Sequence, residues 1–148
     1  MRTFTRFLTA TAVIASCAGF TGCMTPPSTL DLSREKPSAA GHYRVAIVAP
    51  TPAPAVNQLH AWKVRLAGAD GRPVKGAEFS VDGGMPQHGH GYPTRPRVTR
   101  ELEDGTYLLD GMKFSMTGWW DLKLGIRGSE GADAVTFNIV VDPAIPSR

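Results

Sequence analysis

The residues of this chain that could bind a metal ion are concentrated between positions 85 and 116. Two histidines, His88 and His90, flank a single glycine, and three of the five methionines, Met85, Met112 and Met116, lie in the same stretch. Thioether sulfur is a soft donor that suits Cu(I), and imidazole nitrogen suits copper in either oxidation state. The stretch therefore predicts a copper site with these five residues as candidate ligands.

The spacing of these residues sets what each could do. In an extended chain, side chains at positions i and i+2 share a face, so His88 and His90 could approach one ion. A polar surface loop with solvated histidines is the alternative. Met112 and Met116 would be roughly 13 Å apart on a regular strand, so both reach one ion only if the chain bends after Phe114. Because inward methionines usually fill a core, Met112 and Met116 are weaker candidates. Met85 starts the glycine-rich loop and is the strongest soft-ligand candidate, with a methionine that plugs the end of the sandwich as the alternative.

Other kinds of site find little support in the sequence. No nucleophile, base and orienting group are spaced for catalysis, so we expect no enzyme. A three-histidine zinc site that includes His60 has no supporting spacing. Lysines and arginines form no stripe, so we expect no nucleic-acid partner.

The N-terminus has the anatomy of an export signal. Arg2 and Arg6 precede an uncharged apolar run, and small residues then lead to Cys17 and Cys23, each in a lipobox-like context. We predict that residues 1–22 are a lipoprotein signal peptide and that Cys23 carries the lipid, with Cys17 or a plain secretory signal as alternatives. Since Met24 is not the aspartate that favours inner-membrane retention, we expect a periplasm-facing protein on the outer membrane. Loss of two arginines lowers the formal charge from +3 to +1.

The remaining chain reads as a short linker followed by one all-β domain. Residues 23–41, rich in Pro, Ser and Thr, predict a flexible tether, which leaves residues 42–148 for the domain. About seven short segments alternate in polarity between Gly, Pro and Asp turns, which favours an immunoglobulin-like antiparallel β-sandwich over a small closed barrel. Segment 82–97 is expected to be irregular because of its glycines and prolines. The predicted core includes Tyr107 as a corner tyrosine, together with Phe79, Trp120, Leu122 and Leu124. Trp119 is expected to lie outward or beside the metal site, with an ordinary interface tryptophan as the alternative.

Several motifs in combination resemble the YtkA-like and FixH-like domain family. These are Pro73–Ala77 before a strand, Met85-Pro86 followed by His-Gly-His-Gly, Gly105-Thr106-Tyr107, and Phe114–Trp119. The resemblance spans residues 58–141, although Thr117 stands where a proline is common and the membrane helix associated with FixH is absent from the sequence. It implies an exported β-sandwich with a copper-related role, and a copper protein or an oxidase as partner.

These observations lead to two hypotheses of different classes. The first is a lipid-anchored periplasmic copper-binding protein that acts as a metallochaperone or a copper buffer. The second is an adaptor module that binds no metal and docks a membrane protein or a haem protein.

Overall fold

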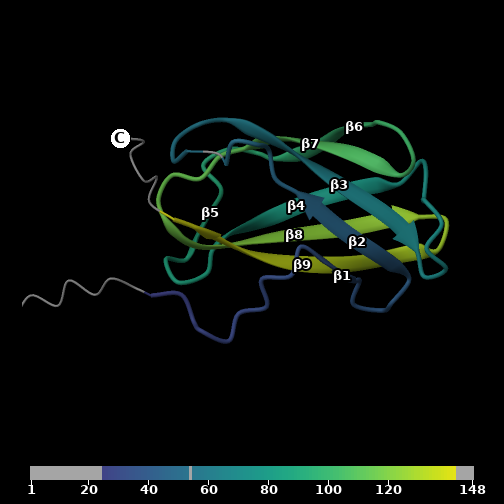
Figure 1. Ribbon diagram of the computed structural model, residues 1–148, viewed down its shortest axis with the longest axis horizontal. Coiled ribbons are helices and arrows are strands. Elements are labelled where there is room, and N and C mark those ends of the chain that lie inside the picture. Colours follow the sequence, from purple (N-terminus) through teal and green to yellow (C-terminus); the bar gives the residue numbers. More distant parts are fainter. Residues whose placement is uncertain (1–24, 54, 143–148) are drawn as a thin grey trace, which may run out of the picture.

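The computed structural model describes residues 25–53 and 55–142, which form nine strands in two antiparallel sheets (Figure 1). The first sheet has the order β1-β2-β3-β7-β6 and the second the order β5-β4-β8-β9. The strands are β1 (Glu35–Pro37), β2 (Tyr43–Val48), β3 (His60–Gly68), β4 (Glu78–Met85), β5 (His90–Gly91), β6 (Arg97–Glu101), β7 (Thr106–Met112), β8 (Gly118–Gly128) and β9 (Gly131–Val141). The predicted all-β sandwich is confirmed, and the described residues contain no helix that could cross a membrane.

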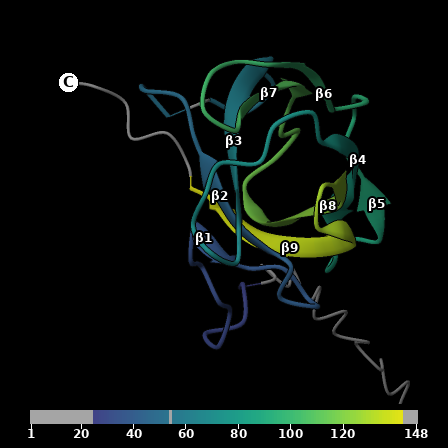
Figure 2. The same cartoon turned by 90° about the vertical axis from the view of Figure 1, so that its right-hand side faces the viewer.

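The core lies between the two sheets, which face each other in the end-on view of Figure 2. Strand residues alternate between core and solvent because successive side chains on a strand point to opposite faces. On β3, Trp62, Val64 and Leu66 are buried while Lys63 and Arg65 are exposed. Tyr107, Trp120, Leu122 and Leu124 are buried as predicted, whereas Phe79 is only partly buried at the margin of the core.

Tyr107 fastens the connection between the sheets, in the role predicted for a corner tyrosine. Its hydroxyl donates a hydrogen bond of 2.8 Å to the carbonyl oxygen of Val74 and accepts one of 3.0 Å from the backbone N–H of Ala77. Burial, the largest influence, raises the pKa of Tyr107, so the hydroxyl stays neutral and available as a donor. The chain from β3 to β4 is thereby fixed to β7.

The prediction that segment 82–97 is irregular is wrong in part. Strand β4 continues through Gly83 and Gly84 to Met85, and β5 pairs with it as the return strand of a hairpin. A side chain at Gly83 would overlap the backbone of Asp121, and one at Gly84 would overlap the backbone of His90. The glycines therefore mark a close approach of neighbouring strands rather than a break in the strand.

The segment predicted as a tether is partly built into the sandwich. Strand β1 adds to the edge of β2, and Ser38 and the backbone N–H groups of Ala40 and His42 donate hydrogen bonds to the carboxylate of Asp133 on β9. Sequence composition missed this because the pairing depends on a residue more than ninety positions away. The predicted signal peptide, with Cys17 and Cys23, lies outside the described residues.

Candidate metal centre

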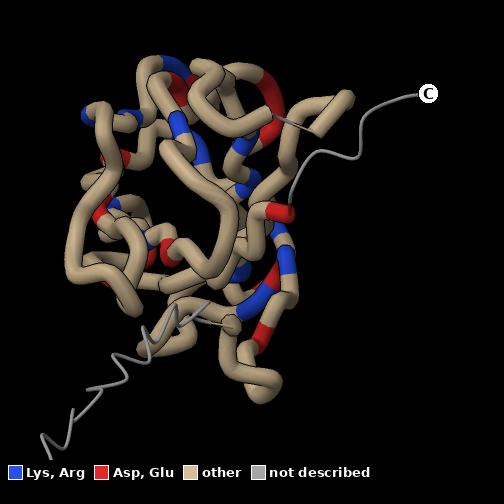
Figure 3. The backbone as a smooth tube through the Cα atoms, turned by 90° about the vertical axis from the view of Figure 1, so that its left-hand side faces the viewer, with Lys and Arg blue, Asp and Glu red and all other residues tan. Residues whose placement is uncertain are grey.

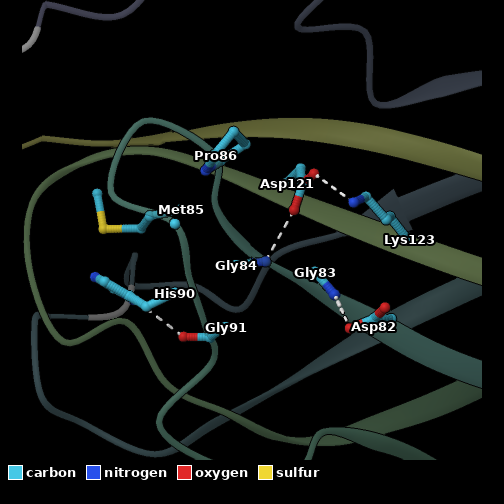
Figure 4. Close-up of a pocket in the computed structure, with 10 residues that line it drawn as sticks. Asp82, Gly83, Gly84, Met85, Pro86, His90, Gly91, Asp121 and Lys123 are labelled. Atoms are coloured by element: carbon cyan, nitrogen blue, oxygen red, sulfur yellow. Dashed lines mark hydrogen bonds and ion pairs between the residues drawn. The ribbon is translucent and has the colours of Figure 1, made fainter.

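The pairing of β4 with β5 places Met85 directly opposite His90. Side chains of directly opposed residues in an antiparallel pair share a face, with Cβ atoms about 5 Å apart. Met85 is 2% exposed and His90 is exposed, so the thioether lies below the imidazole. In Figure 4 both side chains extend to the same side of the hairpin.

The hydrogen bond of His90 sets which ring nitrogen is free. Nδ1 of His90 lies 3.1 Å from the carbonyl oxygen of Gly91. A carbonyl oxygen can only accept, so the neutral ring carries its proton on Nδ1 and leaves the Nε2 lone pair free. Metal-binding histidines commonly hold a backbone carbonyl in this way, because the second hydrogen bond fixes both the tautomer and the ring.

The ring of His88 lies near that of His90. Its backbone N–H, like that of Gly89, donates a 3.0 Å hydrogen bond to the carbonyl oxygen of Met85, which closes the turn between the strands. The ring centroids of His88 and His90 are 5.9 Å apart. Since a ligating nitrogen lies about 2 Å from an ion such as zinc, two imidazoles on one ion have centroids about 5–6 Å apart.

Trp120 connects the loop that carries Met116 to this hairpin. Its indole N–H donates a 3.1 Å hydrogen bond to the carbonyl oxygen of Met116, and its ring meets His90 edge-on at 5.9 Å. The methyl group of Met85 would lie 3.2 Å from a Cβ placed on Gly118, so Met85 also borders this loop. The two predicted clusters therefore meet at one end of the sandwich, with the thioether of Met116 exposed.

The indole beside the histidine is thus Trp120 and not Trp119. The indole N–H of Trp119 donates a 3.0 Å hydrogen bond to Asn138 on the outer face of the second sheet. Strand parity correctly placed Trp120 inward, but it could not show that a ring at the end of a strand also reaches the rim of the core.

Met112 and His60 form a separate pair. Met112 on β7 is fully buried and belongs to the core. Its pairing partner is His60 on the neighbouring strand β3. The indole N–H of Trp62 donates a 2.8 Å hydrogen bond to Nδ1 of His60, so the proton of the neutral ring lies on the buried Nε2. Nδ1 is then occupied by the indole N–H, and Nε2 carries the proton without a hydrogen-bond partner, so the neutral ring of His60 offers no free lone pair to a metal. Among residues 25–53 and 55–142, no three His, Cys, Asp or Glu side chains are grouped to hold an ion.

Three residues that the sequence analysis did not identify support the candidate site: Asp121, Lys123 and Tyr92. The buried carboxylate of Asp121 accepts a 2.8 Å hydrogen bond from the N–H of Gly84 and pairs with Lys123 at 3.2 Å. Tyr92 stacks on Trp120 at 5.4 Å and donates a 2.7 Å hydrogen bond to the carbonyl oxygen of Asp121. Burial raises the pKa of Tyr92, and Asp121 and Asp82 add to that effect, so the phenol stays protonated. The Gly83-Gly84 pair before Met85 was the sequence signal for this close packing, because glycine in a strand often marks the close approach of another backbone.

An open hollow of about 280 Å³ lies beside the hairpin (Figure 4). Its polar wall is formed by Asp82, Asp121 and Lys123, which lie on the other side of the hairpin from Met85 and His90 in that view. Met85 and His90 line the same hollow. One carboxylate oxygen of Asp121 accepts the hydrogen bond from Gly84 and the other pairs with Lys123, while Asp82 accepts a hydrogen bond from the N–H of Gly83.

Fold and site together define a small antiparallel β-sandwich domain with methionine and histidine side chains gathered at one end. The family model described as YtkA-like matches residues 38–125, more than half of the 148 residues. The chain belongs to the YtkA-like family, as its motifs predicted, and the match begins earlier and ends earlier than the predicted span of 58–141. Searches of curated proteins and of solved structures found no match.

Proposed function

We propose that this protein is a lipid-anchored periplasmic copper-binding protein that buffers copper or passes it on. Met85 and His90 are the central ligands, with Met116 and His88 completing the set. The proposed anchor is a lipid on Cys23 in the outer membrane. The observation that carries the proposal is the opposed pair of Met85 and His90, in which the hydrogen bond to Gly91 leaves Nε2 of His90 free above a thioether.

The donor set favours Cu(I) over harder ions. Two thioethers and one or two imidazoles are soft to intermediate donors. Burial of Met85 keeps water from one side of the bound ion, and Met116 on an exposed loop gives the ion a route in and out. Such an arrangement suits reversible exchange with a partner better than permanent storage.

The test is metal binding by the soluble chain that starts at Met24, offered Cu(I), Cu(II) and Zn(II) in competition with chelators of known affinity. We expect one Cu(I) per chain. Met85→Leu conserves volume in the core, and it should weaken Cu(I) binding by about tenfold or more, which is about 1.4 kcal/mol. His90→Asn should weaken it similarly. Because His90 lies 5.9 Å from the ring of Trp120, we expect bound Cu(II) to quench tryptophan fluorescence, and His90→Asn should remove that quenching.

Met112→Leu is the matched control, because it changes another buried methionine that does not face His90. It should bind copper like the parent. Copper binding by Met85→Leu and His90→Asn equal to that of the parent would refute the site. A parent that binds no copper under reducing and oxidising conditions would leave the metal-free adaptor as the better hypothesis.

A further inference from the structure

The connections at the end of the sandwich that holds the methionine–histidine cluster carry fewer charges than those at the opposite end. The connections at this end are residues 49–59 between β2 and β3, 86–89 between β4 and β5, 92–96 between β5 and β6, and 113–117 between β7 and β8. Arg95 and Lys113 are the charged residues in their sequences, and Asp142 follows β9 at the same end. The connections at the opposite end carry six charged residues: Asp70, Arg72, Lys75, Glu103, Asp104 and Glu130. Figure 3 looks onto the cluster end, where the loops nearest the viewer are mostly uncharged.

Exposed apolar side chains gather at the same end. Within the described residues the large exposed hydrophobic side chains are Leu59 (70% exposed), Leu32 (48%) and Met116 (41%). Leu59 immediately precedes His60, which pairs with Met112, and Met116 lies in the loop that leaves Met112. Leu59 and Met116 therefore border the same end of the sandwich, and Leu32 lies in the segment that approaches it.

The N-terminal segment also leads to this end. Asn138 on β9 donates a 3.0 Å hydrogen bond to the carbonyl oxygen of Asp31, and Gln87 in the β4–β5 turn donates one of 3.1 Å to that of Thr25. Thr25 is thus held beside the turn that contains His88. Two residues of chain span at most about 7 Å, so an anchor on Cys23 would lie close to the cluster.

We infer that the cluster end of the domain rests on the surface of the lipid bilayer that anchors the chain, with Leu59 and Met116 against the headgroups. An end with few charges and exposed apolar side chains costs less to bring to a lipid surface than the more highly charged opposite end, which remains hydrated. This inference rests on the anchor in the proposed function and deepens it, because it names the surface that the copper site faces. Copper would then be exchanged at the membrane surface.

The test places a fluorescent thiol label on the full lipidated chain in phosphatidylcholine and phosphatidylglycerol vesicles that contain nitroxide-labelled lipid. Leu59→Cys and Thr117→Cys put the label at the cluster end, and Glu103→Cys and Ser129→Cys put it at the opposite end, all on exposed residues. We expect several-fold stronger quenching for both labels at the cluster end. Two labels at each end guard against a single variant that fails to fold.

Equal quenching at the two ends, or stronger quenching at positions 103 and 129, would overturn the inference. So would a parent chain that carries no lipid and does not float with the vesicles. The measurement is made in chelator without copper, so its result is independent of whether the cluster binds metal. A protein that binds copper but shows equal quenching loses only the orientation, and one that shows the orientation but binds no copper loses only the metal site.

Discussion

Replacement of Trp120 by alanine tests the link between the core and the candidate site. The side chain is fully buried, packs against Phe114 at 5.2 Å and Tyr92 at 5.4 Å, and donates its indole N–H to Met116. Its removal deletes a large apolar volume and leaves the carbonyl oxygen of Met116 without its partner.

The expected loss follows from these contacts. Truncation of a buried large aromatic residue to alanine costs about 3–5 kcal/mol in free energy of unfolding, and a small domain has only about 5–15 kcal/mol in total. At about 4 °C per kcal/mol for a domain of this size, Trp120→Ala should lower Tm by about 12–20 °C. Trp120→Phe keeps most of the apolar volume and removes the hydrogen bond, so its loss should be smaller.

Calorimetry and urea unfolding of the soluble chain give both values. Trp119→Phe is the matched control, because that indole is only partly buried and bonds to Asn138 on the outer face. The reasoning fails if Trp120→Ala melts within a few degrees of the parent. It also fails if Trp119→Phe destabilises the domain as much as Trp120→Ala does.

Three further changes probe separate features. Burial lowers the pKa of His60, so the unfolded chain gains a proton first as pH falls below about 6.5, and the stability of the domain should fall over that range. His60→Gln should reduce this loss of stability between about pH 7 and pH 5, as measured by urea titration. An unchanged pH dependence in the variant would contradict this. Burial alone would raise the pKa of Asp133, but hydrogen bonds from Ser38, Ala40, Ala134 and His42 outweigh it and hold the pKa at about 2. That stabilisation is complete above the ordinary pKa of 3.8 and is lost as pH falls towards 2. Asp133→Asn should lower the free energy of unfolding by about 1–3 kcal/mol at neutral pH. It should also release segment 25–41, which faster amide exchange would show. Gly84→Ala should separate β4 from β5 and weaken Cu(I) binding more than Gly71→Ala, which has positive φ in open space; equal affinities would argue against the hairpin as the site.

Local patterns in the sequence determined most of the fold. Clean alternation in residues 60–66 and 119–126 predicted strands with the correct buried faces, because the side-chain period of a strand is fixed by its backbone. Tyr107 after an Asp-Gly turn predicted the corner that its hydroxyl makes with Val74. The donor chemistry of Met85, His88, His90 and Met116 was likewise readable from the sequence, since it belongs to the residue itself.

Tertiary structure alone decided how these residues meet. The register that sets Met85 opposite His90 depends on Gly83 and Gly84, whose lack of side chains lets Asp121 and the return strand come close. In sequence the same glycines indicate a break, because local propensity does not report what packs against a backbone. The contact of Trp120 with His90 and the hydrogen bond from Gln87 to Thr25 join residues 30 and 62 positions apart. The pairing of β4 with both β5 and β8 brings the first two together, and the path of the N-terminal segment along the domain brings the second two together.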